Sequence, residues 1–215
     1  MTFQAVIFDM DGVIIDSEPI QLARQKEFIA HKNIHISEEE MLKVVGANRK
    51  LTYQIISPYA PEETFDTYFQ GFTDYFKAQK IDFQSILNEE ILTVFDWLKK
   101  KDKKIALASS GSPEKIATVL EECDLAGYFD VVLSGDQFRQ SKPHPEIYFT
   151  TAEKLALPVE ACIVVEDSEY GITAAKKASM YTFAKKETRF NFSQIDADQL
   201  FTDFDELQLA LEKQN

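Results

Sequence analysis

Four short apolar segments, each ending in small, polar or acidic residues, constrain the fold of this chain more than any other feature. They are Ala5–Asp9, Lys104–Ser110, Phe129–Gly135 and Cys162–Asp167. Unbroken apolar runs of this length are typical of strands buried on both faces, as in parallel sheets. Helical patterns lie between them, so the sequence predicts an α/β fold with a doubly wound, mostly parallel, Rossmann-like sheet.

The stretch between the first and second predicted strands is too long for a simple crossover. It holds roughly 90 residues without a comparable strand, far beyond the usual connection. Ser37 and Glu40 have the spacing of a capping box. We therefore predict a helical cap domain over residues 16–87, inserted into an α/β core of residues 1–15 and 88–215. One aromatic stripe has helical spacing, and we assign it to packing within the cap: Phe65, Phe69, Phe72 and Phe76.

The charge and composition of the chain limit the kinds of molecule that it can bind. The chain has 36 acidic and 23 basic residues, a formal net charge of -13, which disfavours nucleic acids and anionic membrane surfaces. The N-terminus reaches Asp9 too early for a signal peptide, and no apolar run approaches the ~20 residues of a membrane span. Cys123 and Cys162 suggest neither a disulfide framework nor a zinc cluster. We expect a cytoplasmic monomer.

The richest segment places Asp9 and Asp11 where a buried strand runs into Gly12. One carboxylate could attack phosphorus while the other handles the proton of the leaving oxygen. The competing interpretation is that both are turn residues before a glycine. An EF-hand fits poorly, because its loop requires glycine where this chain has Ile14.

A second acidic pair, Glu166 and Asp167, ends another predicted strand. Because carboxyl ends of parallel strands share one edge, these acids should meet Asp9 and Asp11. Carboxylates so placed repel each other, by ~4 kcal/mol per pair at 4 Å and an effective dielectric of 20. Mg²⁺ would relieve this repulsion, since it prefers oxygen ligands. We predict metal ligands Asp9, Asp11, Asp167 and, with the weaker role, Glu166.

The negative net charge requires a local cation for any phosphorylated substrate. Lys142 lies just before a proline-opened helix and is predicted to supply that charge. The hydroxyl of Ser109 and the backbone N–H groups of Ser110 and Gly111 could hold phosphate oxygens. His144 is a possible general base, but a capping or loop role is favoured.

These segments together resemble the four ordered motifs of the haloacid dehalogenase-like phosphatase superfamily, over nearly the whole chain. The segment Gly12–Pro19 and the helical insertion are similar to the branch with β-phosphoglucomutase and sugar-phosphate phosphatases. The resemblance implies that Asp9 is the nucleophile and Asp11 the acid/base. It also implies that Ser109 and Lys142 hold the phosphoryl group and that Glu166 and Asp167 hold Mg²⁺.

Differences from the family motifs disfavour some of the activities found in this superfamily. The mutase it resembles has a histidine where this chain has Gln21, and a cap lysine that is missing near Gln70. Phosphonatases and dehalogenases lack the second aspartate, whereas Asp11 is present here. The sequence therefore predicts a Mg²⁺-dependent phosphatase that acts on a small phosphorylated metabolite through an aspartyl-phosphate, with a sugar phosphate as the favoured substrate. Arg49 or Lys50 of the cap would touch the distal part of the substrate.

Two alternatives stay open. One is a phosphohexomutase of the β-phosphoglucomutase type. The other is a phospho-accepting regulatory domain, in which Asp136, after the third predicted strand, would be the phosphorylated residue.

Overall fold

A six-stranded parallel sheet forms the centre of the molecule, and the computed structural model describes residues 3–190 and 192–214. The strand order is β3-β2-β1-β4-β5-β6, with all pairs parallel. The strands are β1 (Ala5–Phe8), β2 (Lys104–Ser109), β3 (Val131–Ser134), β4 (Cys162–Glu166), β5 (Tyr181–Lys185) and β6 (Gln199–Phe201). The predicted doubly wound α/β fold is confirmed.

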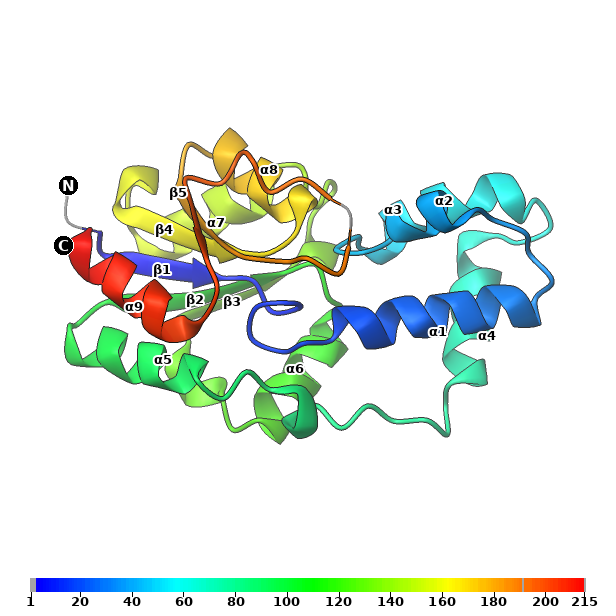
Figure 1. The fold of residues 1–215 in the computed structure, drawn as a ribbon, viewed down its shortest axis with the longest axis horizontal. Coiled ribbons are helices and arrows are strands. Elements are labelled where there is room, and N and C mark those ends of the chain that lie inside the picture. Colours follow the sequence, from blue (N-terminus) through cyan, green and yellow to red (C-terminus); the bar gives the residue numbers. More distant parts are fainter. Residues whose placement is uncertain (1–2, 191, 215) are drawn as a thin grey trace.

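Helices cover both faces of this sheet (Figure 1). They are α5 (Ile91–Lys100), α6 (Pro113–Glu122), α7 (Glu146–Leu155), α8 (Glu169–Lys177) and α9 (Phe204–Lys213). Residues alternate along β1, so that Val6 and Phe8 join the apolar cluster of α5, α6 and α9. Ala5 and Ile7 join the cluster of α7 and α8 on the opposite face. Burial on both faces explains why these strands are continuously apolar in sequence.

A separate group of helices follows β1 and lies beyond the carboxyl edge of the sheet (Figure 1). They are α1 (Glu18–His31), α2 (Glu38–Leu42), α3 (Arg49–Ile56) and α4 (Phe65–Tyr75). They have an apolar cluster of their own, around residues such as Phe28, Ile56 and Tyr68. We call this group the cap.

The two chain segments joining cap and core run side by side. Asp16 donates its N–H to the carbonyl of Ile86 over 2.8 Å, and Asn88 donates to that of Ile14 over 2.9 Å. The division into residues 16–87 and the remainder stays a prediction, and these two hydrogen bonds lie at its two boundaries. Phe83, just before the second crossing, packs with the core cluster of α5.

Several local predictions needed correction. Ser37 does cap α2, but Glu40 does not complete a capping box, because its carboxylate pairs with Lys43. The aromatic stripe is not purely internal to the cap, since Phe69 and Phe72 also line a cavity facing the core.

β5 and β6 were not predicted. Among the described residues no helix is long and apolar enough to cross a membrane.

Candidate active site

Three buried carboxylates meet at the carboxyl edge of the central strands. Asp9 directly follows β1, Glu166 ends β4 and Asp167 follows it. The two strands are neighbours, with Phe8 paired to Val165, so that the side chains converge although more than 150 residues separate them. One oxygen from each carboxylate lies within 4.8 Å of the others. The strand order reverses at this point of the sheet, where doubly wound folds bind ligands.

Lys142 lies among these acids. Its Nζ contacts Asp9 Oδ1 and Glu166 Oε1, each at 2.6 Å, and donates to the Ala108 carbonyl at 2.8 Å. The residue is only 4% exposed. Burial opposes its charge, but Asp9 and Glu166 outweigh that effect and raise the pKa of Lys142. The predicted local cation is therefore present, bonded directly to Asp9.

Glu166 is fully engaged by the protein. Besides Lys142 it accepts from the Tyr148 hydroxyl at 2.8 Å, the Asp167 N–H at 3.0 Å and the Ser168 hydroxyl at 3.1 Å. Both of its oxygens are thus occupied. The geometry favours a positioning role for Glu166, while no hydrogen bond within the described chain occupies the side chain of Asp167.

Asp11 differs sharply from Asp9 in its surroundings. Its Oδ1 forms an ion pair with Lys115 at 2.5 Å and accepts from Gln21 at 3.1 Å. Ser17 also donates to it. Lys115 was missed by sequence reasoning, because a lysine in the first turn of a surface helix is normally a solvated charge.

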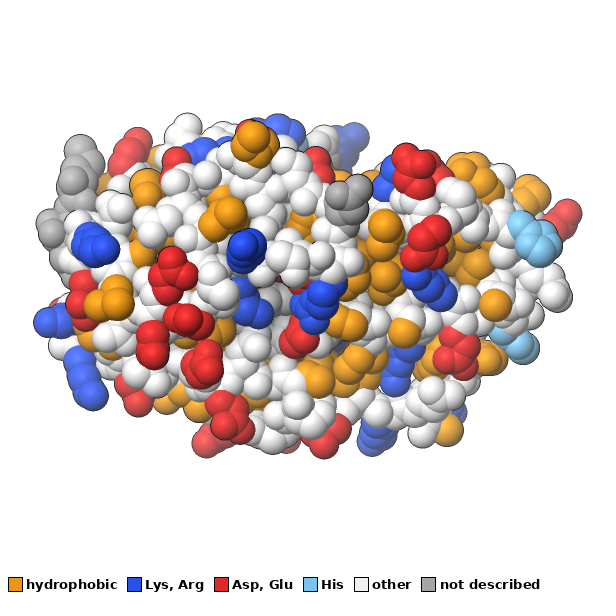
Figure 2. Space-filling model, viewed as in Figure 1, with side chains coloured by type: hydrophobic (Ala, Val, Ile, Leu, Met, Phe, Trp, Pro, Cys, Tyr) orange, Lys and Arg blue, Asp and Glu red, His pale blue; other side chains and the backbone are white. Residues whose placement is uncertain are grey.

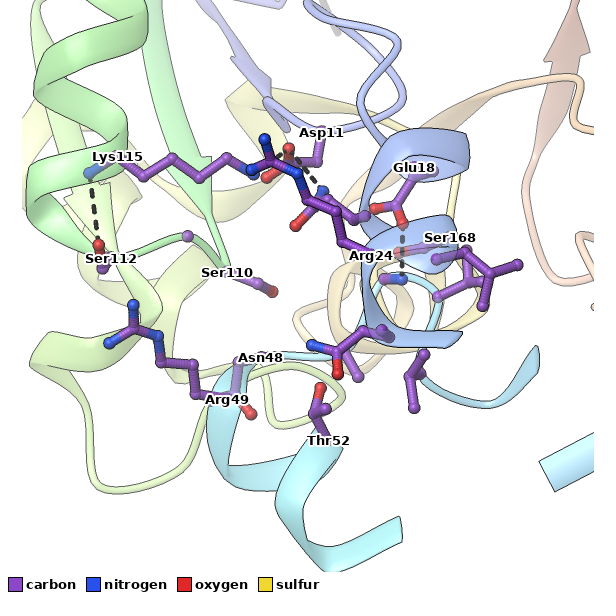
Figure 3. Close-up of a pocket in the computed structure, with 18 of the residues that line it drawn as sticks. Asp11, Glu18, Arg24, Asn48, Arg49, Thr52, Ser110, Ser112, Lys115 and Ser168 are labelled. Carbon is purple, nitrogen blue, oxygen red and sulfur yellow. Dashed lines mark hydrogen bonds and ion pairs between the residues drawn. The ribbon is translucent and has the colours of Figure 1, made fainter. Parts of the chain in front are cut away.

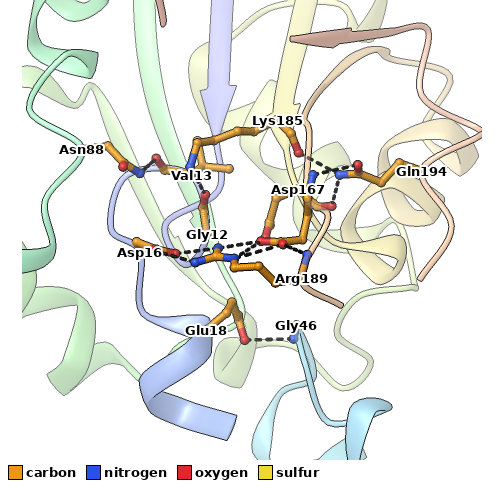
Figure 4. A network of polar contacts seen from close by, with 11 residues as sticks. Gly12, Val13, Asp16, Glu18, Gly46, Asn88, Asp167, Lys185, Arg189 and Gln194 are labelled. Atoms are coloured by element: carbon orange, nitrogen blue, oxygen red, sulfur yellow. Dashed lines mark hydrogen bonds and ion pairs between the residues drawn. The ribbon is translucent and has the colours of Figure 1, made fainter. Parts of the chain in front are cut away.

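Gly12 allows the two acidic segments to approach. Its backbone has φ +79°, and a Cβ at this position would overlap the carboxylate of Asp167. Lys185, at the end of β5, donates to the Gly12 carbonyl at 3.1 Å (Figure 4). The glycine after the aspartates is therefore required both by backbone conformation and by the close passage of Asp167.

The predicted phosphate-binding loop follows β2. Ser110 and Gly111 line the cavity described below. Ser109 is fully buried, and its Oγ accepts the N–H of Gly111 at 2.9 Å. Of the two backbone donors predicted for phosphate, that of Gly111 is thus directed at Ser109. Ser112 caps α6, with its side chain accepting from Lys115 N.

A cavity of about 300 Å³ separates these residues from the cap. Asp9, Asp11, Asp167 and Lys115 line its core side. Figure 3 shows Asn48, Arg49 and Thr52 of the cap across from Ser110. The cap lining also includes amide and aromatic side chains (Gln21, Gln25, Phe69 and Phe72), aliphatic ones and the charged Glu18 and Arg24. The site is thus assembled by both parts of the chain.

The two predicted cap cations differ in position. Arg49 lines the cavity, and its guanidinium lies 5.4 Å from the ring centre of Phe69. Lys50 does not line it; its Nζ lies 3.5 Å from the carbonyl of Phe138 in the core. His144 lies outside the cavity, and its Nδ1 accepts from Glu146 N at the start of α7, which agrees with the favoured loop role.

The buried acids need a cation to remain ionised together. Burial raises the pKa of Asp9, and Glu166 and Asp11 add to the rise, against the lowering effect of Lys142. Burial likewise raises the pKa of Asp167, with contributions from Glu166 and Glu18. A hard dication bound by Asp9 and Asp167 would oppose both shifts, because it favours the charged forms.

Comparison with known proteins agrees with this geometry. The family model described as haloacid dehalogenase-like hydrolase matches residues 6–185. The chain belongs to this family. The superfamily resemblance drawn from the motifs is therefore confirmed.

Two curated relatives of this hydrolase carry phosphatase names. A phosphorylated carbohydrates phosphatase of Thermotoga maritima is 31% identical over 179 residues, covering 82% of each chain. A phosphoglycolate phosphatase of Aquifex aeolicus is 29% identical, covering 83% of each chain. The β-phosphoglucomutase structure from Clostridium difficile has a TM-score of 0.79 and 19% identity over 98% of both chains, a likeness of fold.

Gly46 of the hydrolase provides a test of cap position. It has φ +72°, and a Cβ here would lie 2.6 Å from that of Ser168, the residue after Asp167. We expect Gly46→Ala to destabilise this approach of the cap to Ser168 by about 1–2 kcal/mol through the left-handed backbone alone. The expected result is a fall of about tenfold in kcat/KM for 4-nitrophenyl phosphate, with faster proteolysis of the two connecting segments. Gly127→Ala, whose Cβ meets nothing within 4 Å, is the control; equal effects of both substitutions would contradict the role given to the Gly46–Ser168 contact.

Proposed function

We propose that the protein is a Mg²⁺-dependent phosphatase that hydrolyses a small phosphorylated carbohydrate through an aspartyl-phosphate on Asp9. The observation that carries this proposal is the environment of Asp9. Its carboxylate lines the cavity, is held through Oδ1 by buried Lys142 and lies within reach of Asp167. The names of the relatives support a phosphorylated carbohydrate as the substrate class.

Asp9 would attack the phosphorus in line, so that a carboxylate–phosphorus bond forms and the ester P–O bond breaks. Asp11, beside it in the cavity wall, would give its proton to the departing alkoxide. Asp11 would then take a proton from the water that attacks phosphorus, releasing phosphate and restoring Asp9. Proton transfer of this kind contributes ~10² to 10⁴ in rate.

Electrostatic stabilisation of the transition state must supply most of the remaining rate acceleration, since enzymes accelerate the hydrolysis of phosphate monoesters by up to ~10²¹-fold. Asp9 and Asp167 would hold Mg²⁺, which when bound neutralises phosphoryl oxygens and orients the ester. Lys142 adds a fixed positive charge at Asp9. Lys115 and Gln21 keep Asp11 turned towards the cavity.

One face of the molecule is strongly acidic. Figure 2 shows acidic side chains gathered on the face over α5 and α9. The net charge of -13 would repel a phosphorylated substrate over most of the molecule. Lysines buried or half-buried at the cavity, together with the metal, would attract it locally.

The alternative functions gain no support from the site. Gln21 contacts Asp11 where the mutase it resembles has a histidine, and an amide neither takes nor gives a proton near neutral pH. For a phospho-accepting domain, Asp136 lies after β3, an edge strand of the sheet, and its side chain is exposed. A mutase would interconvert hexose 1- and 6-phosphates with a bisphosphate primer, and a receiver would hold phosphate stably after treatment with acetyl phosphate.

Asp9→Asn tests the proposed nucleophile. We expect kcat for 4-nitrophenyl phosphate or a sugar phosphate to fall by on the order of 10³-fold or more, as when other covalent nucleophiles are removed. Phosphate release measures the rate, and EDTA should abolish it in the wild type. Asp136→Asn, an exposed carboxylate beyond the site, should remain within about twofold of wild type. Full activity of Asp9→Asn would remove Asp9 from this role.

Metal binding is tested by thermal unfolding, without reference to activity. Mg²⁺ must bind the ionised carboxylates, and their pKa values are raised, so protons compete as the pH falls. We expect Mg²⁺ at 100 times its Kd to stabilise the folded protein by about 2.7 kcal/mol, and to raise Tm more at pH 8 than at pH 5.5. Without metal, stability should decline as pH rises through these titrations, because the ionised forms are disfavoured in the folded state. Asp167→Asn should lose the Mg²⁺ effect; the same rise in that variant at both pH values would contradict the assignment.

A further inference from the structure

Glu18 is a buried carboxylate that the proposed mechanism does not use. It is the first residue of α1, where the chain enters the cap, and it is 5% exposed. It lines the same cavity as Asp9 and Asp11. It lies outside the group formed by Asp9, Glu166 and Asp167, whose carboxylates could hold a metal ion.

The carboxylate oxygens of Glu18 accept few hydrogen bonds from the protein. Its Oε2 accepts one long hydrogen bond, 3.4 Å, from Gly46 N (Figures 3 and 4). Within residues 3–190 and 192–214, Oε1 accepts none. By contrast, both oxygens of Glu166 are bonded. Among the described residues, Asn48 Nδ2 is the one fully buried side-chain polar atom without a partner, so Glu18 Oε1 is still accessible and can accept from a group in the cavity. Burial raises the pKa of Glu18 to about 8.

The charges around Glu18 do not cancel it. Asp11 and Glu166 add to its raised pKa, while Lys115 lowers it and already pairs with Asp11. The cavity arginines are directed elsewhere. Arg24 donates to the Gln79 carbonyl and lies 5.0 Å from the ring centre of Phe76, while Arg49 lies over Phe69. A second anion of the substrate would therefore meet an uncompensated carboxyl group at this position.

A hydroxyl group, in contrast, suits Glu18 in either protonation state. An ionised carboxylate accepts from a hydroxyl, and a protonated one can both donate and accept. The adjoining cap wall has neutral amides and aromatic faces, namely Gln21, Gln25, Phe69 and Phe72. Such a wall suits the hydroxyls and C–H groups of a sugar or polyol.

We infer that Glu18 is a specificity-determining residue, which accepts a hydrogen bond from a hydroxyl of the leaving group. It thereby selects neutral polyhydroxylated phosphomonoesters over phosphomonoesters that carry a second anion. This inference rests on the proposed phosphatase function and adds a substrate class to it.

The competing explanation is structural: Glu18 would merely hold the Gly46 loop and favour the start of α1 through its negative charge. The two explanations differ in substrate selectivity. A structural defect lowers turnover of all substrates together, whereas loss of a hydroxyl contact affects the polyol ester selectively. Ratios of kcat/KM measured on one preparation also cancel any fraction of unfolded enzyme.

The experiment compares wild type with Glu18→Gln on three phosphomonoesters in Mg²⁺. These are the best-hydrolysed member of a panel of sugar and polyol monophosphates, 2-phosphoglycolate, and 4-nitrophenyl phosphate. Wild type should prefer the polyol ester to 2-phosphoglycolate by at least about tenfold. At pH 9, where Glu18 is ionised, Glu18→Gln should lower kcat/KM for the polyol ester about 5- to 10-fold, because a neutral amide oxygen is a weaker acceptor than a carboxylate. The same substitution should raise kcat/KM for 2-phosphoglycolate. It should leave kcat/KM for 4-nitrophenyl phosphate within about threefold of the wild-type value.

The matched control is Glu27→Gln, the same chemical change on an exposed residue of α1 that does not line the cavity. Its selectivity should equal that of wild type. Equal losses on all three esters in Glu18→Gln, unchanged selectivity, or a wild-type preference for 2-phosphoglycolate would each overturn the inference while leaving the phosphatase function intact. Failure of wild type to hydrolyse any of the three would overturn the proposed function and this inference with it.

Discussion

The buried contact of Lys142 with Asp9 and Glu166 is the interaction on which the rest of the site depends. Lys142 precedes α7, Asp9 follows β1 and Glu166 ends β4, so a single ammonium group ties together three distant parts of the chain. Removing one partner from such a group leaves an uncompensated buried charge, which typically costs about 3–5 kcal/mol. The contact therefore fixes the position of Asp9 as well as its charge.

The cap and the carboxyl edge of the sheet together form the active-site cavity. The carboxyl edge supplies the acids and Lys142, but the cavity has walls from both cap and core. Contacts between the two include the Tyr170 hydroxyl with the Lys43 carbonyl at 3.0 Å. Arg189 also holds Asp16, at the entrance to the cap, through two hydrogen bonds of 2.8 Å (Figure 4). The cavity is thus lined, and held in place, by both parts of the fold.

Sequence reasoning predicted the core motifs because a parallel sheet brings strand ends to one edge. Asp9, Ser109 and Asp167 all directly follow or end apolar strands, so their convergence could be inferred without coordinates. β6 was missed because three residues, Gln199–Phe201, carry too short a pattern. Lys115 and Glu18 were missed for another reason. In the sequence each has the pattern of a solvated charge on a helix, and only the tertiary structure places each side chain at the cavity.

The covalent role of Asp9 is tested most directly by trapping its phosphorylated form. Enzyme turning over 4-nitrophenyl phosphate would be quenched in acid, reduced with borohydride and digested for mass spectrometry. An acyl phosphate on Asp9 is reduced to the alcohol, so this account predicts homoserine at position 9. Reduction at another residue, or none during sustained turnover, would contradict it.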